Sequence, residues 1–223
     1  MTVPAVLFSA GLDSAVLLAD AAARFEGAQP IYVSAGLAWE PQERAMAALF
    51  LSSLPSTAQI QPLVTLEVTM RDVFPASHWA IRGDAPGFDT PDSDVFIDGR
   101  NIILLSKAGV FAARAGLSRI LIGPLSGNPF PDASPEFFAA MARALSLGLG
   151  TGIEIDAPFL SLNKADVIRL GLERNVRLEL TLSCMQPVDG MHCGQCSKCR
   201  ERRDAFRDAG VEDPSPYASR PPR

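Results

Sequence analysis

Short apolar runs alternate along the chain with longer stretches in which apolar residues recur at helical spacing. Pro135 begins one of these stretches, at a position where its missing N–H costs a helix nothing. Gly171 follows another and is expected to end it. We expect strands at 3–8, 31–34, 63–68, 119–122 and 153–155, and helices at 14–25, 42–54, 101–115, 135–147 and 163–170. This alternation predicts an α/β domain with a doubly wound parallel sheet.

Loops that follow the strands are the expected binding segments, because ligands of such sheets lie beyond the carboxyl ends of the strands. Three loops qualify, at 9–14, 70–99 and 123–134. The second is long and rich in Gly, Pro and Asp, which is typical of functional or disordered segments. From about residue 182 the chain becomes rich in cysteine, and from 213 it resembles an extended tail. We therefore expect a main domain over 1–181 and a small C-terminal module and tail over 182–223.

Composition narrows the class of protein. The 223 residues include 20 Lys+Arg and 25 Asp+Glu, for a net charge of −5, and 48% are hydrophobic. These values exclude wholesale disorder, and the acidic balance disfavours nucleic-acid binding over a broad surface, although a local basic patch is compatible with it. No apolar run reaches the roughly 18 residues of a membrane span, and segment 3–8 lacks the basic flank of a signal peptide. We expect a cytoplasmic protein with no membrane partner.

All four cysteines lie in one short stretch, as Cys184-x₈-Cys193-x₂-Cys196-x₂-Cys199. Clustered thiols in a reducing compartment usually hold a metal. Four thiolates suit tetrahedral Zn²⁺ and leave no open coordination position, so the predicted site is structural. An iron–sulfur cluster and a redox Cys-x-x-Cys pair are the alternatives. His192 is expected to be a neighbour of the site rather than a ligand, and the other histidine, at position 78, a surface residue.

Segment 8–14 (Phe8, Ser9, Ala10, Gly11, Leu12, Asp13, Ser14) joins the first strand to the first helix. Backbone N–H groups at a helix N-terminus bind anions, and Gly11 permits close approach of a phosphate. The hydroxyls of Ser9 and Ser14 add donors. Because a carboxylate in a phosphate loop needs a bridging cation, Asp13 suggests Mg²⁺ held against a triphosphate. The simpler alternative is a plain strand-to-helix turn, and the Walker pattern is absent.

Ser-Ala-Gly-Leu-Asp-Ser at 9–14 resembles the Ser-Gly-Gly-x-Asp-Ser motif of the PP-loop ATP pyrophosphatases, which split ATP between its α- and β-phosphates to adenylate a substrate. The resemblance implies that residues 8–14 bind ATP and Mg²⁺. It departs at Ala10, where the family usually has Gly. A negative φ at this residue would make alanine harmless, whereas a positive φ would make it damaging.

The loop and the cysteine spacing together are similar to those of the 7-cyano-7-deazaguanine synthases of the queuosine precursor pathway. Asp98-Gly99-Arg100-Asn101 resembles that family's Pro-Gly-Arg-Asn, and segments 144–148 and 163–166 also have counterparts. Arginines at 200, 202 and 203 follow the last cysteine, as in the family. The resemblance extends from about residue 3 to residue 217.

The resemblance implies a reaction on 7-carboxy-7-deazaguanine. Its carboxylate would attack the α-phosphate of ATP, ammonia would displace AMP to give an amide, and a second ATP would drive dehydration to the nitrile. Asp13 and Ser14 would act with Arg100 and Lys164, whose charges would offset those of the phosphates or the carboxylate. Without the motif, Arg100 and Lys164 are equally well interpreted as solvated charges. The family also implies a homodimer.

Departures from the family concentrate in two loops. Residues 35–37 are Ala-Gly-Leu instead of Tyr-Gly-Gln, and loop 124–133 lacks the family's acidic residue and final Cys. We expect substrate contacts from five residues: Asn101 (or a helix cap), Ser126, Gly127, Phe130 (on a flat base, or filling the loop) and Asp132. Three alternatives stay open: a paralogue with another acid or acceptor such as a protein amine, a PP-loop tRNA-modifying enzyme, and a zinc-dependent interaction module that has lost ATP.

Overall fold

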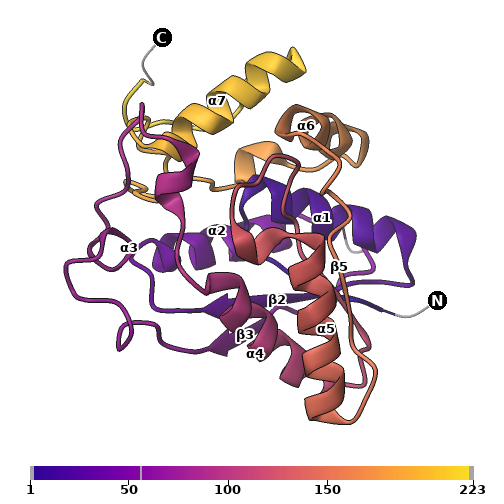
Figure 1. Ribbon diagram of the computed structural model, residues 1–223. Coiled ribbons are helices and arrows are strands. Elements are labelled where there is room, and N and C mark those ends of the chain that lie inside the picture. The colour runs from indigo at the N-terminus through magenta and orange to yellow at the C-terminus, as the bar shows by residue number, and fades with distance from the viewer. Residues whose placement is uncertain (1–2, 56, 221–223) are drawn as a thin grey trace.

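The computed structural model describes residues 3–55 and 57–220, so the last three residues of the expected tail and the first two of the expected main domain lie outside the described residues. A single parallel sheet forms the centre, in the order β3-β2-β1-β4-β5 (Figure 1). The strands are β1 (Ala5–Leu7), β2 (Gln29–Ser34), β3 (Val64–Glu67), β4 (Arg119–Leu121) and β5 (Glu154–Asp156).

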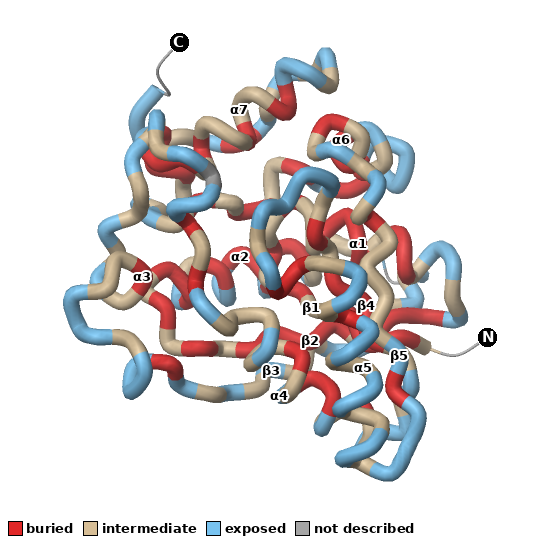
Figure 2. The backbone as a smooth tube through the Cα atoms, in the orientation of Figure 1, coloured by how far each residue is buried: buried red, intermediate tan, exposed pale blue. Residues whose placement is uncertain are grey.

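Helices cover both faces of the sheet, as predicted. Successive strand residues point to opposite sides, so each face presents apolar side chains that helices bury. Val6 and Leu121 face a buried cluster shared with α1, α2, α6 and α7, whereas Ala5 and Ile120 face a cluster shared with α4 and α5. The tube in Figure 2 accordingly runs red, or buried, through the central strands. The helices are α1 (Leu12–Arg24), α2 (Glu40–Ser52), α3 (Trp79–Arg82), α4 (Arg100–Arg114), α5 (Pro135–Leu149), α6 (Lys164–Glu173) and α7 (Ser197–Ala209); short 3₁₀ turns are η1 (Asp92–Val95), η2 (Pro131–Ala133) and η3 (Leu178–Leu180).

The prediction that Gly171 ends a helix is wrong. Helix α6 continues to Glu173, and Gly171 is buried within it. A Cβ at this position would lie 2.9 Å from Val16 Cγ2 of α1, a distance too short for side-chain contact. Glycine is therefore present to let two helices pack closely, not to turn the chain. The start of α6 has a capping box: the backbone N–H of Asp166 donates to the side chain of Asn163, and the backbone N–H of Asn163 donates to the carboxylate of Asp166.

Strand β1 pairs with β2 on one side and with β4 on the other, so the order of the strands reverses at this point. The loops that leave β1 and β4 consequently run in opposite directions and leave a crevice at the carboxyl edge. The fold thus places the first and third of the predicted binding loops on either side of one opening.

The C-terminal cysteine segment packs directly on this domain. Its four cysteines belong to the same buried cluster as Val16 and Phe8, and α7 lies along α6 (Figure 1). The backbone N–H of Leu182 donates to the carbonyl of Ala10 at 2.8 Å, which joins the entry of the segment to the loop after β1. The long loop is held as well, since Ser197 N donates to the carbonyl of Pro86 at 3.0 Å.

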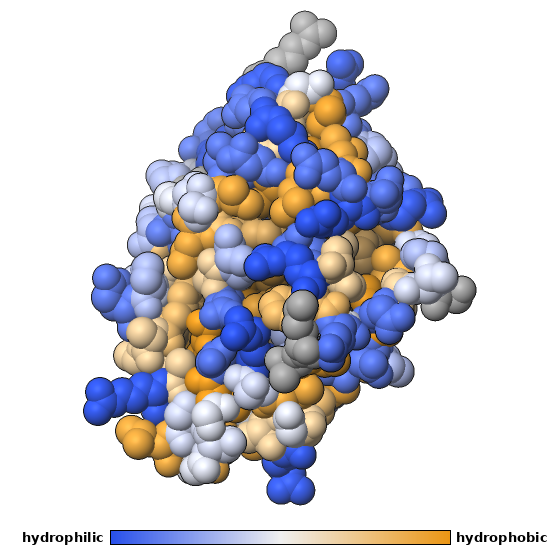
Figure 3. All heavy atoms as spheres, turned by 90° about the vertical axis from the view of Figure 1, so that its right-hand side faces the viewer, coloured by the Kyte–Doolittle hydropathy of each residue, from blue (hydrophilic) through white to orange (hydrophobic). Residues whose placement is uncertain are grey.

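Among the described helices, none combines the length and the apolar character required to cross a bilayer. The face of the molecule seen in Figure 3 mixes hydrophilic and hydrophobic side chains.

Candidate functional site

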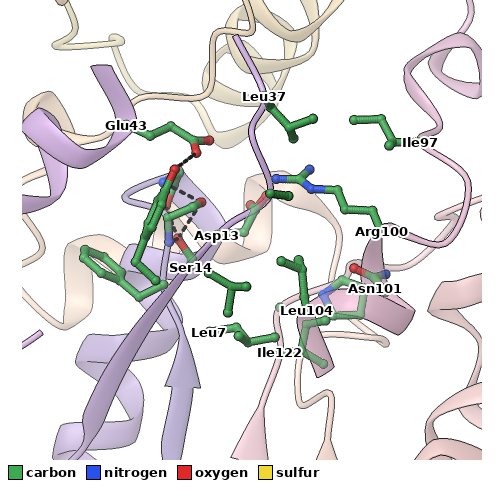
Figure 4. Close-up of a pocket in the computed structure, with 18 of the residues that line it drawn as sticks. Leu7, Asp13, Ser14, Leu37, Glu43, Ile97, Arg100, Asn101, Leu104 and Ile122 are labelled. Atoms are coloured by element: carbon green, nitrogen blue, oxygen red, sulfur yellow. Dashed lines mark hydrogen bonds between the residues drawn. The ribbon is translucent and has the colours of Figure 1, made fainter. Parts of the chain in front are cut away.

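A cavity of about 270 Å³ opens at the carboxyl ends of β1, β2 and β4 (Figure 4). Its apolar floor includes Leu7, Leu104 and Ile122, and its polar wall includes Asp13 and Arg100. The crevice predicted from the strand order is therefore a real concavity, lined by both apolar and charged side chains. Concave sites with a few convergent polar groups are the usual binding sites of small molecules.

The loop after β1 forms one end of this cavity. Its hydroxyls bond within the loop: Ser9 N–H donates to Ser14 Oγ at 3.2 Å, and Ser14 Oγ donates to the carbonyl of Gly11 at 3.0 Å. Gly11 precedes α1 and supplies no side-chain cap, so the first turn of that helix presents its N–H groups to the cavity end. This arrangement suits an anion, because the positive end of the helix dipole points the same way. Ser9, Gly11, Asp13 and Ser14 line the cavity with Phe8.

Ala10 and Leu12 do not line the cavity but lie buried beneath the loop. Ala10 has φ of 60°, the left-handed region in which glycine is strongly favoured. Alanine at this position was expected to be harmless only with a negative φ, and the observed φ is positive. The loop is thus formed with local strain, on the order of 1–2 kcal/mol for an L-residue other than glycine.

Lys164 reaches the loop from the start of α6. Its Nζ lies 3.0 Å from Asp13 Oδ2 and 2.5 Å from Glu201 Oε1 of α7. Burial alone would lower the pKa of Lys164, but the carboxylates of Asp13 and Glu201 outweigh it and leave that pKa raised. Lys164 is therefore a fixed positive charge at the edge of the loop after β1. It stands behind Asp13 and is not itself part of the cavity lining.

Arg100, the first residue of α4, extends into the cavity towards the side where Asp13 and Ser14 lie (Figure 4). Its Nε is buried without a hydrogen-bond partner, and so is Oδ1 of Asp13. Buried polar atoms normally have partners, and unpaired ones in a cavity are consistent with a site for a ligand. These two groups have opposite charges, so a ligand that places a cation at the carboxylate of Asp13 and an anion at the guanidinium of Arg100 would satisfy both.

Asn101 and Asp132 bind one another. The carboxylate of Asp132 accepts from the backbone N–H of Asn101 at 3.0 Å, and the amide of Asn101 donates to the carbonyl of Asp132 at 2.9 Å. The alternative interpretation of Asn101 as a helix cap is therefore wrong, because Gly99 is the residue that caps α4. A backbone N–H in the first turn of α4 instead donates to the carboxylate of Asp132, which lies on another loop. Burial raises the pKa of Asp132, while its bond to Asn101 opposes the rise. Both residues line the cavity.

Phe130 also lines the cavity, where its ring stacks on that of Phe96 at a centroid distance of 5.0 Å. Two long loops thus meet at this wall. By contrast, Ser126 and Gly127 are exposed on the same loop and are not among the residues that line the cavity. The structure therefore brings together Asn101, Phe130 and Asp132 from the predicted substrate set and leaves Ser126 and Gly127 at the surface.

Two buried glutamates at the start of α2 were missed by the sequence analysis. Glu43 accepts from the hydroxyl of Tyr32 at 2.9 Å and from the indole N–H of Trp39 at 3.1 Å. Burial raises the pKa of Glu43 to about 7, against the opposing charge of Arg100. Glu40 instead accepts from backbone N–H groups of the loop after β2, including Ala35 at 2.7 Å. Two acidic residues at the start of a helix after a strand were the available signal.

The four cysteines form the predicted cluster, with all four sulfur atoms within 4.8 Å of one another. Zn–S bonds of about 2.3 Å would place tetrahedral sulfur atoms about 3.8 Å apart. The Sγ atoms of Cys184 and Cys196 are 3.8 Å apart, as are those of Cys193 and Cys199. Backbone N–H groups point at the sulfurs, such as Gly194 N–H to Cys199 Sγ at 3.3 Å, which favours thiolates. The donor set therefore fits a metal ion.

Both histidines lie outside this cluster. His192 is buried beside it, and its Nε2 accepts from the N–H of Ser183 at 3.2 Å. His78 directly precedes α3 and caps it: its Nδ1 accepts from the N–H of Ala80 at 3.3 Å. Neither lines the cavity.

The parallel sheet, the Ser-Ala-Gly-Leu-Asp-Ser loop at the point where strand order reverses, and the C-terminal four-cysteine cluster define an α/β protein of the PP-loop type. The family model described as "Queuosine biosynthesis protein QueC" matches residues 4–210. The chain belongs to this family, as the sequence resemblance predicted.

Relatives named 7-cyano-7-deazaguanine synthase agree. The protein from Solidesulfovibrio magneticus is 34% identical over 95% of this chain and 94% of its own. The protein from Anaeromyxobacter dehalogenans is 37% identical over 55% of this chain and 56% of its own length. The protein from Thermoplasma volcanium is 38% identical over 56% of this chain and 54% of its own length. The chain therefore matches little more than half the length of these two relatives. Among solved structures, an NMN synthetase from Francisella tularensis shares 13% identity at a TM-score of 0.46, over 93% of this chain and 77% of that one.

Proposed function

We propose that this protein adenylates the carboxylate of 7-carboxy-7-deazaguanine with ATP and converts it with ammonia, through the amide, to 7-cyano-7-deazaguanine. One observation carries the proposal: in a chain of this family, a phosphate loop, an unpaired Asp13 oxygen and an unpaired Arg100 nitrogen converge on one cavity. Phosphoryl chemistry of this kind requires positioning and charge stabilisation rather than covalent participation of the protein.

In this proposal the loop residues hold the pyrophosphate portion of ATP. The N–H groups at the start of α1 and the hydroxyls of Ser9 and Ser14 would bind phosphate oxygens. Asp13 would hold Mg²⁺, which would neutralise phosphate charge; its Oδ1 is buried and without a partner. Arg100 would bind the carboxylate or the α-phosphate, and Lys164 would add positive charge from behind the loop.

The opposite wall would take the flat heterocycle. Phe96 and Phe130 present aromatic surface there, and Asn101 and Asp132 provide polar edges. The carboxyl group of the substrate would then face Arg100, between this wall and the phosphate loop. Ser126 and Gly127 remain candidate substrate residues only if their loop moves towards the cavity when substrate binds.

The four cysteines would hold structural Zn²⁺, whose coordination they complete without water. Metal analysis of the purified protein tests this, with one zinc per chain expected and iron with visible absorption supporting the iron–sulfur alternative. A cytoplasmic homodimer is part of the same proposal, and sedimentation of the purified protein at micromolar concentration tests the dimer.

The deciding experiment measures pyrophosphate and AMP release with ATP, Mg²⁺, ammonium and 7-carboxy-7-deazaguanine, with products identified by mass spectrometry. Formation of the nitrile would support the proposal. Absence of pyrophosphate from protein with its metal in place would contradict it.

A second function uses the same adenylation but a different acceptor, such as a protein amine. The observation that favours it is that both altered loops line the cavity, through Ala35 and Leu37 on one side and Asn128 and Phe130 on the other. Release of pyrophosphate with only the adenylate or amide formed would favour this alternative. Efficient conversion to the free nitrile with ammonium would reject it.

A further inference from the structure

Glu201 belongs to the cysteine segment, and its carboxylate lies next to Lys164, behind the loop after β1. It lies on α7, two residues after Cys199, and its Oε1 is 2.5 Å from Lys164 Nζ. The same ammonium is 3.0 Å from Asp13 Oδ2. Three segments far apart in the sequence, the phosphate loop, the start of α6 and α7, thus meet at one ion cluster.

The position of Glu201 is fixed from several sides. Its second oxygen, Oε2, lies 2.5 Å from Lys198 Nζ. The helix that carries it starts within the cysteine cluster and is anchored by the buried Arg202. The side chains of Lys164, Asp13 and Glu201 are only 13%, 26% and 22% exposed, so solvent screens this cluster weakly.

Asp13 pairs with one cation in the structure and would face a second one if Mg²⁺ bound. Lys164 binds its Oδ2, while its Oδ1 is buried and unpaired. If Lys164 had no other carboxylate, Mg²⁺ at Asp13 would have to compete with the ammonium and leave it unpaired in a buried setting, which is costly. Glu201 supplies that other carboxylate. The ammonium can therefore keep a partner when Asp13 turns to a metal ion.

We propose that Glu201 is a positioning residue that holds the Lys164 ammonium beside the phosphate loop and leaves Asp13 free to bind Mg²⁺. This inference rests on the proposed function, because it assumes that Mg²⁺ and ATP bind at the loop. It assigns to the cysteine segment a part in the nucleotide site beyond closing the fold, since that segment contributes the carboxylate.

The test compares Glu201→Gln with Asp208→Asn in the full-length, metal-loaded protein. Asp208 lies on the same helix and its substitution removes the same charge, but its side chain pairs only with the exposed Arg207 among the ion pairs of the described residues. Calorimetry measures binding of Mg²⁺ in the presence of an ATP analogue that cannot be cleaved between the α- and β-phosphates. We expect the apparent Mg²⁺ dissociation constant to rise roughly tenfold in Glu201→Gln and to stay unchanged in Asp208→Asn.

A third variant, Glu201→Asp, keeps the charge but shortens its reach by one methylene, and we expect an intermediate rise. Metal content and melting temperature are measured for each variant, so that a loss of fold is recognised; if Glu201→Gln loses its metal, the Glu201→Asp result decides. Equal binding by wild type and Glu201→Gln would overturn the inference, and so would equal shifts in both charge-removing variants. If the wild type itself bound no Mg²⁺ with the analogue, the proposed function would fail first.

Discussion

Arg202 and Arg100 are both inside the molecule, yet their surroundings differ in kind. Arg202 is fully buried, and its guanidinium donates to Asp213, to the hydroxyls of Thr181 and Ser215, and to a backbone carbonyl. Arg100 lines the cavity, and its Nε has no partner. The first arginine is satisfied by the fold, whereas the second retains hydrogen-bonding capacity for something that the fold does not supply.

The acids near each arginine differ in the same sense. Burial alone would raise the pKa of Asp213, but the paired Arg202 reverses this and leaves that pKa below its ordinary value. Glu43 is held by neutral donors, Tyr32 and Trp39, so burial dominates and its pKa rises to about 7. The direct ion pair with Arg202 stabilises the negative charge of Asp213, whereas Arg100, which makes no direct ion pair with Glu43, stabilises the charge of Glu43 only weakly. The contrast distinguishes polar groups that the fold pairs with an opposite charge from polar groups that line the cavity.

Arg202→Ala should break the satisfied region. Removing one partner of a buried ion pair leaves Asp213 charged without compensation, at a cost of about 3–5 kcal/mol in the free energy of unfolding. Denaturation by urea, followed by circular dichroism, measures the change. A loss below about 1 kcal/mol would show that the network around Arg202 contributes little to stability.

Arg100→Ala should leave stability nearly unchanged and remove activity. A side chain whose Nε has no hydrogen-bond partner in the protein contributes little to the fold, whereas loss of a group that stabilises developing charge typically lowers kcat by about 10²–10³. Pyrophosphate release and urea denaturation are measured on the same preparation. Unaltered turnover in the variant would contradict the proposed role of Arg100, and a large loss of stability would contradict its contrast with Arg202.

Glu43→Gln should change how stability depends on pH. The folded-state pKa of Glu43, about 7, lies above its ordinary value of 4.5, so the folded state holds this proton more tightly than the unfolded state does. The resulting stabilisation is present below pH 4.5 and is lost as the pH rises through about 7. Relative to the wild type, the variant should gain stability over this range, by at most about 3 kcal/mol. Parallel stability curves from pH 4.5 to 8 would show that Glu43 ionises normally.

Ala10→Gly should have the smallest effect. Relief of the left-handed strain at residue 10 is partly offset by the greater freedom of glycine in the unfolded chain, for a net stabilisation of up to about 1 kcal/mol. Thermal denaturation measures this, and binding of an ATP analogue shows whether the relaxed loop also binds more tightly. Destabilisation by glycine would mean that the Cβ of Ala10 contributes more by packing than its backbone costs.

The sequence predicted those parts of the site that depend on neighbouring residues. The loop at 9–14 and the cysteine spacing each place their groups within a few residues, so their geometry follows from local structure. The sequence also predicted that the sheet would be parallel with helices on both faces. Asn101 and Phe130 were each expected to contact the substrate; both line the same cavity, and their contact with a substrate stays a prediction.

Other features depend on contacts between distant segments. Glu201 meets Lys164 across 37 residues, and Asp132 satisfies the first turn of α4 across 31. Gly171 looked like a helix end because its true reason, the approach of α1, lies far away in sequence. The sign of φ at Ala10 likewise depends on the turn between β1 and α1, and on the bond from Leu182, rather than on the residue itself.

The bond between Leu182 and Ala10 has a consequence for the order in which the molecule can be assembled. The loop after β1 is synthesised before its clamp, Leu182, and before Glu201, the ion partner of Lys164; both follow the loop by more than 150 residues. The central strand β1 must also wait for β4, its partner in the sheet. Contacts of such long range slow folding because a large loop must close before they form. The end of the cavity formed by the loop after β1 should therefore be among the last parts of a nascent chain to reach its final shape, and mutations in α7 should affect how fast it does so.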